Sequence, residues 1–311
     1  MAERAELLDV TIRDGGYVNG HSWTIAQATR LVTACRAAGV PYIEIGYLRP
    51  GRHAVDGDEA PSASCPPAYL ERVAEAAAGI DTVVMAHAKD TVPEDLARLA
   101  DFGVSMVRMP TRPDRLERLA PYADAAHGAG LSFAVNLIRV SEVPDHDVVA
   151  AARTAEEITA DIFYLADSNG SLFPEDVGRL CGMVRESTGA TLGFHPHDGI
   201  SMSFANTLTA MRLGARYVDA SLSGMGKGGG NLSLQLITGY LRSRACQAFC
   251  VTPLVDAAAD LLVPWKGDQI LAQCESIASG LLDLNMEDLA EIRAMNPKKV
   301  FSILDGTSAV R

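Results

Sequence analysis

The sequence lacks several features that mark other classes of protein. No two cysteines have the CxxC spacing of a zinc ribbon or a redox motif, and no stretch approaches the roughly 20 apolar residues of a membrane-spanning helix. Arg and Lys are dispersed along the chain rather than gathered into a stripe, and the net charge is -12 at pH 7. We therefore expect neither nucleic acid nor a membrane as a partner.

The cysteines and the first residues bear on the compartment. The cysteines are Cys35, Cys65, Cys181, Cys246, Cys250 and Cys274. Because none lies in a spacing typical of a metal site, we expect reduced and mostly buried thiols. The first ten residues, MAERAELLDV, contain two Glu and no apolar core of a signal peptide. These observations predict a cytoplasmic protein.

The order of short strands and helices predicts the fold class. Short β-branched runs alternate with stretches of helical period as far as about residue 244. The predicted strands are 7–12, 42–46, 82–86, 105–109, 132–137, 162–166, 191–195 and 217–221. The predicted helices between them are 25–38, 68–78, 93–102, 115–128, 147–158, 175–186, 203–213 and 232–242. Eight such units predict an α/β protein, a (β/α)₈ TIM barrel.

Two further features define the predicted domains. A doubly wound open sheet would have a GxGxxG turn after its first strand, whereas this chain has RDGG there. We expect residues 1–245 to form the catalytic barrel and residues 246–311 a helical C-terminal extension, packed on the barrel or against a second subunit. Breaks in the extension are expected at 264–267 and at Pro297.

Polar residues at strand ends are the candidates for chemistry, because the catalytic face of a barrel lies where its strands end. Asp14 follows the first strand, and His195 and His197 end the seventh in an HPH triplet. Residues two apart in an extended segment project to the same side, so both imidazoles can face one ion. Two imidazoles and one carboxylate suit Mn²⁺, Mg²⁺ or Co²⁺ and leave positions open for a chelating 2-oxo acid. The HPH triplet alone would be explained equally well by a strand end capped by two histidines.

Arg13 precedes the predicted carboxylate ligand. A fixed cation at this place would add positive charge beside the keto oxygen that the metal polarises. The alternative for Arg13 is an ion pair that closes the barrel mouth. Glu44, near the end of the second strand, could hold a metal-bound water or pair with Arg13, and we favour the pairing. We also count Glu44 among the residues expected to bind substrate.

A glycine-rich segment, GMGKGGGN, follows the eighth strand. Glycines such as Gly226 let backbone amides approach an anionic group closely. Lys227 could meet a substrate carboxylate, and Asn231 could reach the metal through its side-chain oxygen. The alternatives are a flexible loop and a surface charge.

Three segments carry a resemblance to a known group of enzymes. TIRDGG, GFHPHDGISMSFAN and VDASLSGMGKGGGN resemble the DRE-TIM metallolyase superfamily (HMG-CoA lyase-like domain), and within it the 4-hydroxy-2-oxovalerate aldolases. The resemblance covers about residues 7–240. It implies Asp14, His195 and His197 as metal ligands, Asn231 as a further ligand, and Arg13 as the group that stabilises the enolate. Arg108 and Asn136 match less specific positions of a substrate pocket.

One position departs from the aldolase pattern. Those enzymes carry a catalytic His three residues after the metal-binding Asp, and this chain has Tyr17 there, with His21 as its nearest histidine. Either His21 acts as the base, or Tyr17 relays the proton, or the substrate differs. An unperturbed imidazole titrates near 6.5 and a phenol near 10, so His21 has the more suitable pKa and Tyr17 the matching position.

The resemblance implies a divalent-metal-dependent carbon–carbon lyase, an aldolase that converts a 4-hydroxy-2-oxo acid to a pyruvate-type 2-oxo acid and an aldehyde through a metal-bound enolate. Mn²⁺ is the expected ion, with Mg²⁺, Co²⁺ or Zn²⁺ as alternatives. We also expect a homo-oligomer, and a dehydrogenase partner is left open because the C-terminal segment is short. The alternatives are a Claisen-type synthase that condenses an acyl-CoA with a 2-oxo acid, and a barrel that has lost catalysis.

Overall fold

The computed structural model describes residues 5–52, 60–244, 247–265, 282–295 and 299–304. Eight parallel strands form a closed barrel in chain order, and β1 pairs with β8 to close it. The strands are β1 (Glu6–Asp9), β2 (Tyr42–Leu48), β3 (Asp81–Ala86), β4 (Val104–Thr111), β5 (Ser132–Leu137), β6 (Ile162–Asp167), β7 (Thr191–Pro196) and β8 (Tyr217–Ala220). The predicted TIM barrel is confirmed.

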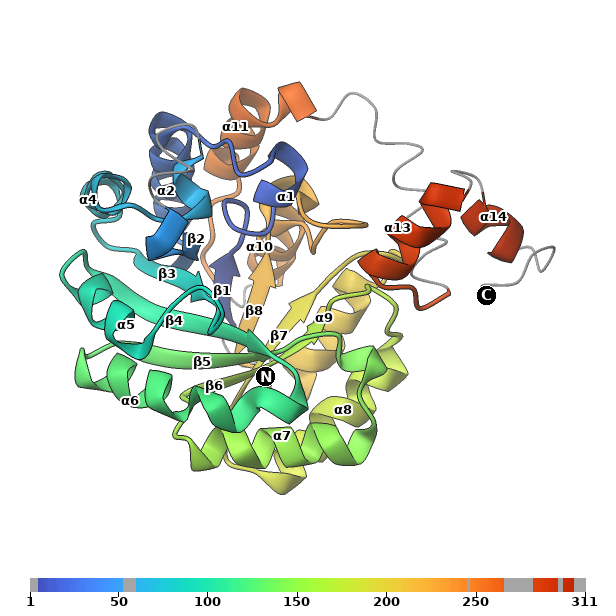
Figure 1. The fold of residues 1–311 in the computed structure, drawn as a ribbon. Helices are drawn as coiled ribbons and strands as arrows, with labels where there is room; N and C mark the ends of the chain where they lie inside the picture. Colours follow the sequence, from blue (N-terminus) through green and yellow to red (C-terminus); the bar gives the residue numbers. More distant parts are fainter. Residues whose placement is uncertain (1–4, 53–59, 245–246, 266–281, 296–298, 305–311) are drawn as a thin grey trace.

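Helices surround the barrel (Figure 1). The α-helices are α1 (Gly16–Asn19), α2 (Ile25–Ala38), α4 (Pro67–Ala76), α5 (Pro93–Ala100), α6 (Ala120–Gly128), α7 (Asp145–Glu157), α8 (Pro174–Ser187), α9 (Ser203–Arg212), α10 (Leu234–Ser243), α11 (Thr252–Leu261), α13 (Met286–Met295) and α14 (Lys299–Leu304). The 3₁₀ helices are η1 (Pro50–Arg52), η2 (Pro61–Ala63), η3 (Pro113–Leu119), η4 (Val140–Glu142), η5 (Leu222–Gly224) and η6 (Val263–Trp265). The helix predicted at 115–128 is split into η3 and α6. Pro121, near the start of α6, has no N–H to continue a preceding helix.

The first strand ends earlier than predicted, at Asp9 rather than at residue 12. The Asp9 carboxylate accepts hydrogen bonds from the Thr11 N–H at 3.1 Å and the Thr11 hydroxyl at 2.6 Å. Such local bonds compete with the strand ladder. The chain then turns, with the Asp14 N–H donating to the Val10 carbonyl at 2.8 Å. This turn carries Arg13 and Asp14 over the barrel mouth.

The barrel interior contains two layers of different chemistry. The apolar layer consists of Leu8, Val10, Val83, Met106, Ala134, Ile162 and Tyr164. The ionic layer consists of Glu44, Arg108, Asn136 and Asp219, all buried, and on β4 and β5 it follows the apolar residues Met106 and Ala134 by two positions. Both layers follow the period of two of inward-facing residues in a strand. A larger apolar core fills the space between the barrel and the helices.

The described part of the C-terminal segment contacts two sides of the barrel. Helix α11 packs on α2, where Arg30 and Asp260 form an ion pair at 3.0 Å. Helix α13 lies on the other side of the mouth (Figure 1), where Arg139 binds Glu287 at 2.6 Å and the Ser171 hydroxyl donates to Asp283 at 2.7 Å.

The two-domain division of the chain stays a prediction. Of the two breaks expected in the extension, the first, at 264–267, overlaps the end of η6, and its last two residues lie outside the described residues, as does Pro297. Within the described ranges, no helix is both long enough and apolar enough to span a membrane.

Candidate metal centre

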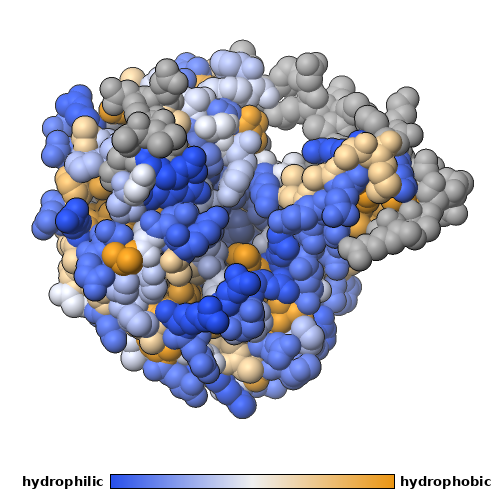
Figure 2. Space-filling model, viewed as in Figure 1, coloured by the Kyte–Doolittle hydropathy of each residue, from blue (hydrophilic) through white to orange (hydrophobic). Residues whose placement is uncertain are grey.

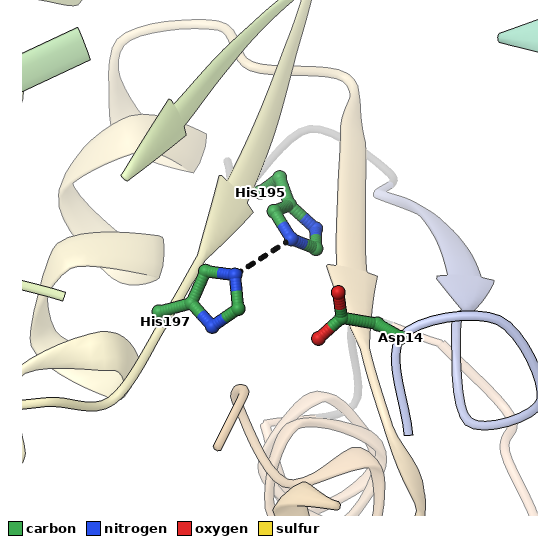
Figure 3. Close-up of side chains that lie close together, drawn as sticks. All are labelled: Asp14, His195 and His197. Atoms are coloured by element: carbon green, nitrogen blue, oxygen red, sulfur yellow. Dashed lines mark hydrogen bonds between the residues drawn. The ribbon is translucent and has the colours of Figure 1, made fainter. Parts of the chain in front are cut away.

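Asp14, His195 and His197 come together at the barrel mouth. Each offers a ligand atom, and these atoms lie within 4.8 Å of one another. The Nε2 atoms of the two histidines are 3.3 Å apart, and the carboxylate faces them across a small space (Figure 3). All three side chains are buried. The structure therefore brings together the three residues that the sequence suggested as ligands.

The other nitrogen of each imidazole is held by an acceptor. Nδ1 of His195 lies 2.7 Å from Oδ2 of Asp219, and Nδ1 of His197 lies 3.1 Å from the Gly230 carbonyl oxygen. An Nδ1–H that donates to an oxygen leaves the Nε2 lone pair free to bind a metal. Burial lowers the pKa of His197 to about 4, which keeps the imidazole in its neutral, ligating form.

Asp219 is a residue that the sequence reasoning missed. Gly193 pairs with Tyr217 in neighbouring strands, and two residues further along each strand are His195 and Asp219. The alternation of β8 places this carboxylate on the inner face, so a signal was present. Asp219 becomes a candidate only when the residues of the neighbouring strands β7 and β8 are considered together.

Asn231 supplies an atom that the described residues leave unsatisfied. Its Nδ2 donates to Oδ2 of Asp14 at 2.8 Å, whereas its buried Oδ1 has no hydrogen-bond partner in the described part of the chain. A short β-bridge holds Asn231 beside His197. A buried oxygen without a donor, next to two imidazoles and a carboxylate, fits the ligand set of a divalent cation.

The glycine-rich loop approaches the site closely. A Cβ on Gly226 would lie 2.3 Å from Nδ2 of Asn231 and 2.8 Å from Oδ2 of Asp14, so only glycine fits there. The Lys227 N–H donates to the same Asp14 oxygen at 3.3 Å. Its ammonium group lies 5.7 Å from the centre of the Tyr17 ring. The substrate contacts expected of Gly226 and Lys227 stay predictions.

Arg13 links the candidate ligands to the ionic layer. Its Nη1 donates to Asp14 at 2.6 Å and its Nε to Glu44 at 2.6 Å, so the favoured pairing with Glu44 is present. Its buried Nη2 has no partner among the described residues. Burial alone would raise the pKa of Asp14, but the Arg13 charge and the two imidazoles hold that pKa well below its usual value.

Arg108 lies at the centre of the ionic layer and is fully buried. It donates to Glu44 at 3.3 Å, to Asp219 at 2.5 Å and to Asn136 at 3.3 Å. Its guanidinium also lies 4.1 Å from the centre of the Tyr164 ring. Glu44, Arg108 and Asn136, which were predicted to bind substrate, therefore form a network that connects Arg13 with His195 through Asp219. Direct contact of these three residues with substrate stays a prediction.

Tyr17 and His21, the two candidates for the base, lie close together with a third ring. The ring centres of Tyr17 and His21 are 5.2 Å apart, and those of His21 and Tyr47 are 5.5 Å apart. The hydroxyl oxygens of Tyr17 and Tyr47 are 2.9 Å apart. Tyr47 was not among the predicted site residues.

The volumes of two cavities do not by themselves identify the candidate metal centre. A cavity of about 630 Å³ lies at the opposite end of the barrel, among residues such as Glu6 and Arg216. A cavity of about 520 Å³ adjoins Asn231 and is lined in part by Phe204 and Trp265. Only the second lies next to the candidate ligands. The viewed face is largely hydrophilic and has a hollow beside α13 (Figure 2).

The chain resembles known proteins in sequence. Residues 4–260 match the HMGL-like family. An oxaloacetate decarboxylase from Mycobacterium tuberculosis is 31% identical over 242 residues, which are 76% of this chain and 70% of that protein. A 4-hydroxy-2-oxovalerate aldolase from Moorella thermoacetica is 32% identical over 247 residues, 77% of this chain and 71% of the aldolase.

Solved structures share the fold. The N-terminal domain of a candidate aldolase from Bacteroides vulgatus superposes with a TM-score of 0.81 at 24% identity, covering 96% of this chain and 99% of that domain. The HMG-CoA lyase of Bacillus subtilis superposes with a TM-score of 0.71 at 18% identity, covering 85% of this chain and 94% of the lyase. At these identities the likeness concerns the fold alone.

Proposed function

Since this chain belongs to the HMGL-like family, we propose that it is a divalent-metal-dependent aldolase that converts a 4-hydroxy-2-oxo acid to a pyruvate-type 2-oxo acid and an aldehyde. The observation that carries the proposal is the convergence of Asp14, His195 and His197 within 4.8 Å. The similarity to aldolases and to a decarboxylase supports a lyase that acts on oxo acids.

The donor atoms define the class of ion. Asp14, His195 and His197 would hold it, and the unsatisfied Oδ1 of Asn231 would be a further ligand. We propose Mn²⁺, with Mg²⁺, Co²⁺ or Zn²⁺ as alternatives, because mixed nitrogen and oxygen ligands suit all four. A divalent cation bound here would act as a Lewis acid on the keto oxygen of the substrate.

The chain's own residues supply the remaining electrostatics. Arg13 is held on two sides by Asp14 and Glu44, so its charge is fixed before substrate binds. Its Nη2 remains available to donate to the developing negative oxygen when the carbon–carbon bond breaks. Lys227 and the backbone of the glycine-rich loop would bind the substrate carboxylate. Tyr17 or His21 would take the hydroxyl proton.

Decarboxylation of oxaloacetate is a second candidate, favoured by the similarity to the Mycobacterium tuberculosis protein. Both reactions break a carbon–carbon bond next to a 2-oxo group and leave negative charge on the same oxygen. The two relatives reported above are lyases, and neither is a condensing synthase. The aldolase reaction therefore remains the proposal, and decarboxylation serves as a companion assay.

The proposed partners are small molecules, a 2-oxo acid and an aldehyde. A homo-oligomer and a cytoplasmic location stay predictions, and a dehydrogenase partner stays open. Size-exclusion chromatography with light scattering would measure the oligomeric state.

The experiment is an activity screen on metal-stripped protein. 4-Hydroxy-2-oxovalerate and oxaloacetate are supplied with Mn²⁺, Mg²⁺, Co²⁺ or Zn²⁺, and pyruvate formation is followed. We expect activity only after metal is restored. His195→Ala should reduce it to background while the far-UV circular dichroism is retained, because one ligand of the ion and the partner of Asp219 are lost.

His146→Ala is the matched control, since this histidine is exposed on α7 and its nearest ionic partner is Asp147 at 3.4 Å. It should behave as wild type. Full activity of the stripped protein without metal, or of His195→Ala with it, would contradict the proposed metal centre.

A further inference from the structure

Tyr47 reaches the barrel mouth because β2 contains one extra residue. Along the β2–β3 ladder, Glu44 lies opposite Val83 and Tyr47 lies opposite Met85. Strand β2 thus takes three steps where β3 takes two. An extra residue of this kind is a β-bulge, which turns the side chains that follow it.

Gly46 makes the bulge possible. Its φ angle is 148°, and a Cβ at this position would lie 2.3 Å from the Ser62 carbonyl oxygen. Both observations restrict the position to glycine. The bulge is therefore built into the sequence.

The bulge changes which face of the strand Tyr47 occupies. Glu44 faces the barrel interior, and Ile43 and Ile45 pack in the outer core. Regular alternation would place Tyr47 on the side of Ile45. Instead Leu48 packs in the outer core, and Tyr47 meets Tyr17 at the mouth.

The two phenols differ in their surroundings. Tyr47 is 2% exposed and Tyr17 is 48% exposed, and their hydroxyl oxygens are 2.9 Å apart. Burial raises the pKa of Tyr47 well above its ordinary value, although the nearby Arg13 charge acts in the opposite direction. Tyr47 is therefore a neutral phenol near Arg13, and its hydrogen-bond partner reaches solvent.

We propose that Tyr47 and Tyr17 form a proton relay that carries the hydroxyl proton of the substrate from the buried site to solvent. This inference rests on the proposed aldolase function and assigns its proton transfer. The His21 ring lies edge-on to both phenols, and in this proposal it packs against the pair and does not take the proton.

The proposed step conserves protons and electrons. The substrate hydroxyl gives its proton to the Tyr47 oxygen while Tyr47 passes its own to Tyr17 and Tyr17 passes one to water. The bond between C3 and C4 breaks, its electron pair remains on C3, and C4 becomes the aldehyde carbonyl. A proton from solvent then adds to C3. Each phenol accepts and donates in the same step, so neither needs to ionise, in agreement with the raised pKa of Tyr47.

The test compares two reactions of the same protein. Cleavage of 4-hydroxy-2-oxovalerate requires loss of a hydroxyl proton, whereas decarboxylation of oxaloacetate does not. We expect Tyr47→Phe and Tyr17→Phe each to lower kcat for cleavage by about 100-fold, which is the lower end of the usual contribution of a proton-transfer group to the rate. Decarboxylation should stay within about threefold of wild type, because the metal ligands and Arg13 remain.

A double variant and a control sharpen the test. If the phenols act in series, Tyr17→Phe combined with Tyr47→Phe should be no slower than either single variant. Tyr122→Phe removes a hydroxyl that donates to the Thr91 carbonyl at 2.7 Å, away from the candidate ligands, and should keep both activities. Tyr17→Phe alters an exposed ring, so it gives a result even if Tyr47→Phe does not fold.

The outcomes separate the two proposals. Equal loss of both reactions, or no loss of cleavage, would overturn the relay and leave the aldolase function standing, as would a double variant with multiplied effects. A wild-type protein that decarboxylates but never cleaves would overturn both the relay and the aldolase assignment. A wild-type protein without either activity would remove the proposed function itself.

Discussion

The apolar layer and the ionic layer of the barrel interior share strands β4 and β5, and their burial affects the free energy of folding in opposite ways. On β4 they are only two residues apart, at Met106 and Arg108. Burial of Met106 removes apolar surface from water and stabilises the fold. Burial of Arg108 with two carboxylates costs desolvation, which the ion pairs offset only in part. The ionic layer is therefore better explained by what it positions, namely Arg13 through Glu44 and His195 through Asp219.

Breaking the ionic layer should have the largest effect. Arg108→Met preserves much of the volume and leaves Glu44 and Asp219 without their shared cation. We expect the free energy of unfolding to fall by about 3 to 5 kcal/mol, as for one partner removed from a buried pair. Urea denaturation followed by circular dichroism measures it.

The matched control is Arg139→Met, which removes an ion pair with the largely exposed Glu287. It should cost at most about 1 kcal/mol. If Arg108→Met were as stable as this control but had a strongly raised KM, Arg108 would bind substrate rather than support the layer.

The next effect concerns the charge that the ionic layer holds in place. Arg13→Lys keeps the charge but cannot bind Asp14 and Glu44 while presenting a third nitrogen. We expect kcat to fall by about 10² to 10³-fold, comparable with the loss of an oxyanion donor, with little change in KM. Steady-state kinetics at saturating metal measure both constants.

Arg112→Lys provides the comparison for this substitution, because Arg112 pairs with the partly exposed Glu142 at 3.1 Å. It should retain wild-type kinetics. An Arg13→Lys enzyme with an unchanged kcat would show that charge alone suffices at that position.

The smallest effect should come from the apolar layer. Ile162→Val removes one methylene from a side chain that is 2% exposed, and we expect a loss of about 0.5 to 1.5 kcal/mol in unfolding free energy. Because Ile162 lies in the apolar layer and not among the candidate ligands, kcat should not change. A tenfold loss of kcat without a stability change would mean that the two layers are not independent.

The patterns that were local in sequence predicted the fold and brought forward the candidate ligands. Periods of two and 3.6 residues identified the eight strands and most helices, because burial of one face leaves its mark within a short window. Asp14, His195 and His197 could be expected to lie close together because strand ends meet at one face of a barrel, and the structure brings them within 4.8 Å.

Other features are not recorded in the periodicity of apolar residues. The early end of β1 follows from local side-chain bonds between Asp9 and Thr11, which the alternation of apolar residues does not reveal. The role of Asp219 follows from its neighbour on β7. Asp283, which accepts hydrogen bonds from Ser141 and Ser171, is brought to the loops after β5 and β6 by the C-terminal segment. Sequence spacing gave no distance for the pairs that Asp219 and Asp283 form.

The bulge at Gly46 has an evolutionary consequence. In a homologue whose second strand is regular, the residue two positions after the glutamate would face the barrel mouth, whereas here it is the third. An alignment without a gap at Gly46 would match Tyr47 with a residue of the outer core. Insertion or loss of a single codon in this strand can therefore change which side chain faces a substrate, although every neighbouring residue of the strand stays the same.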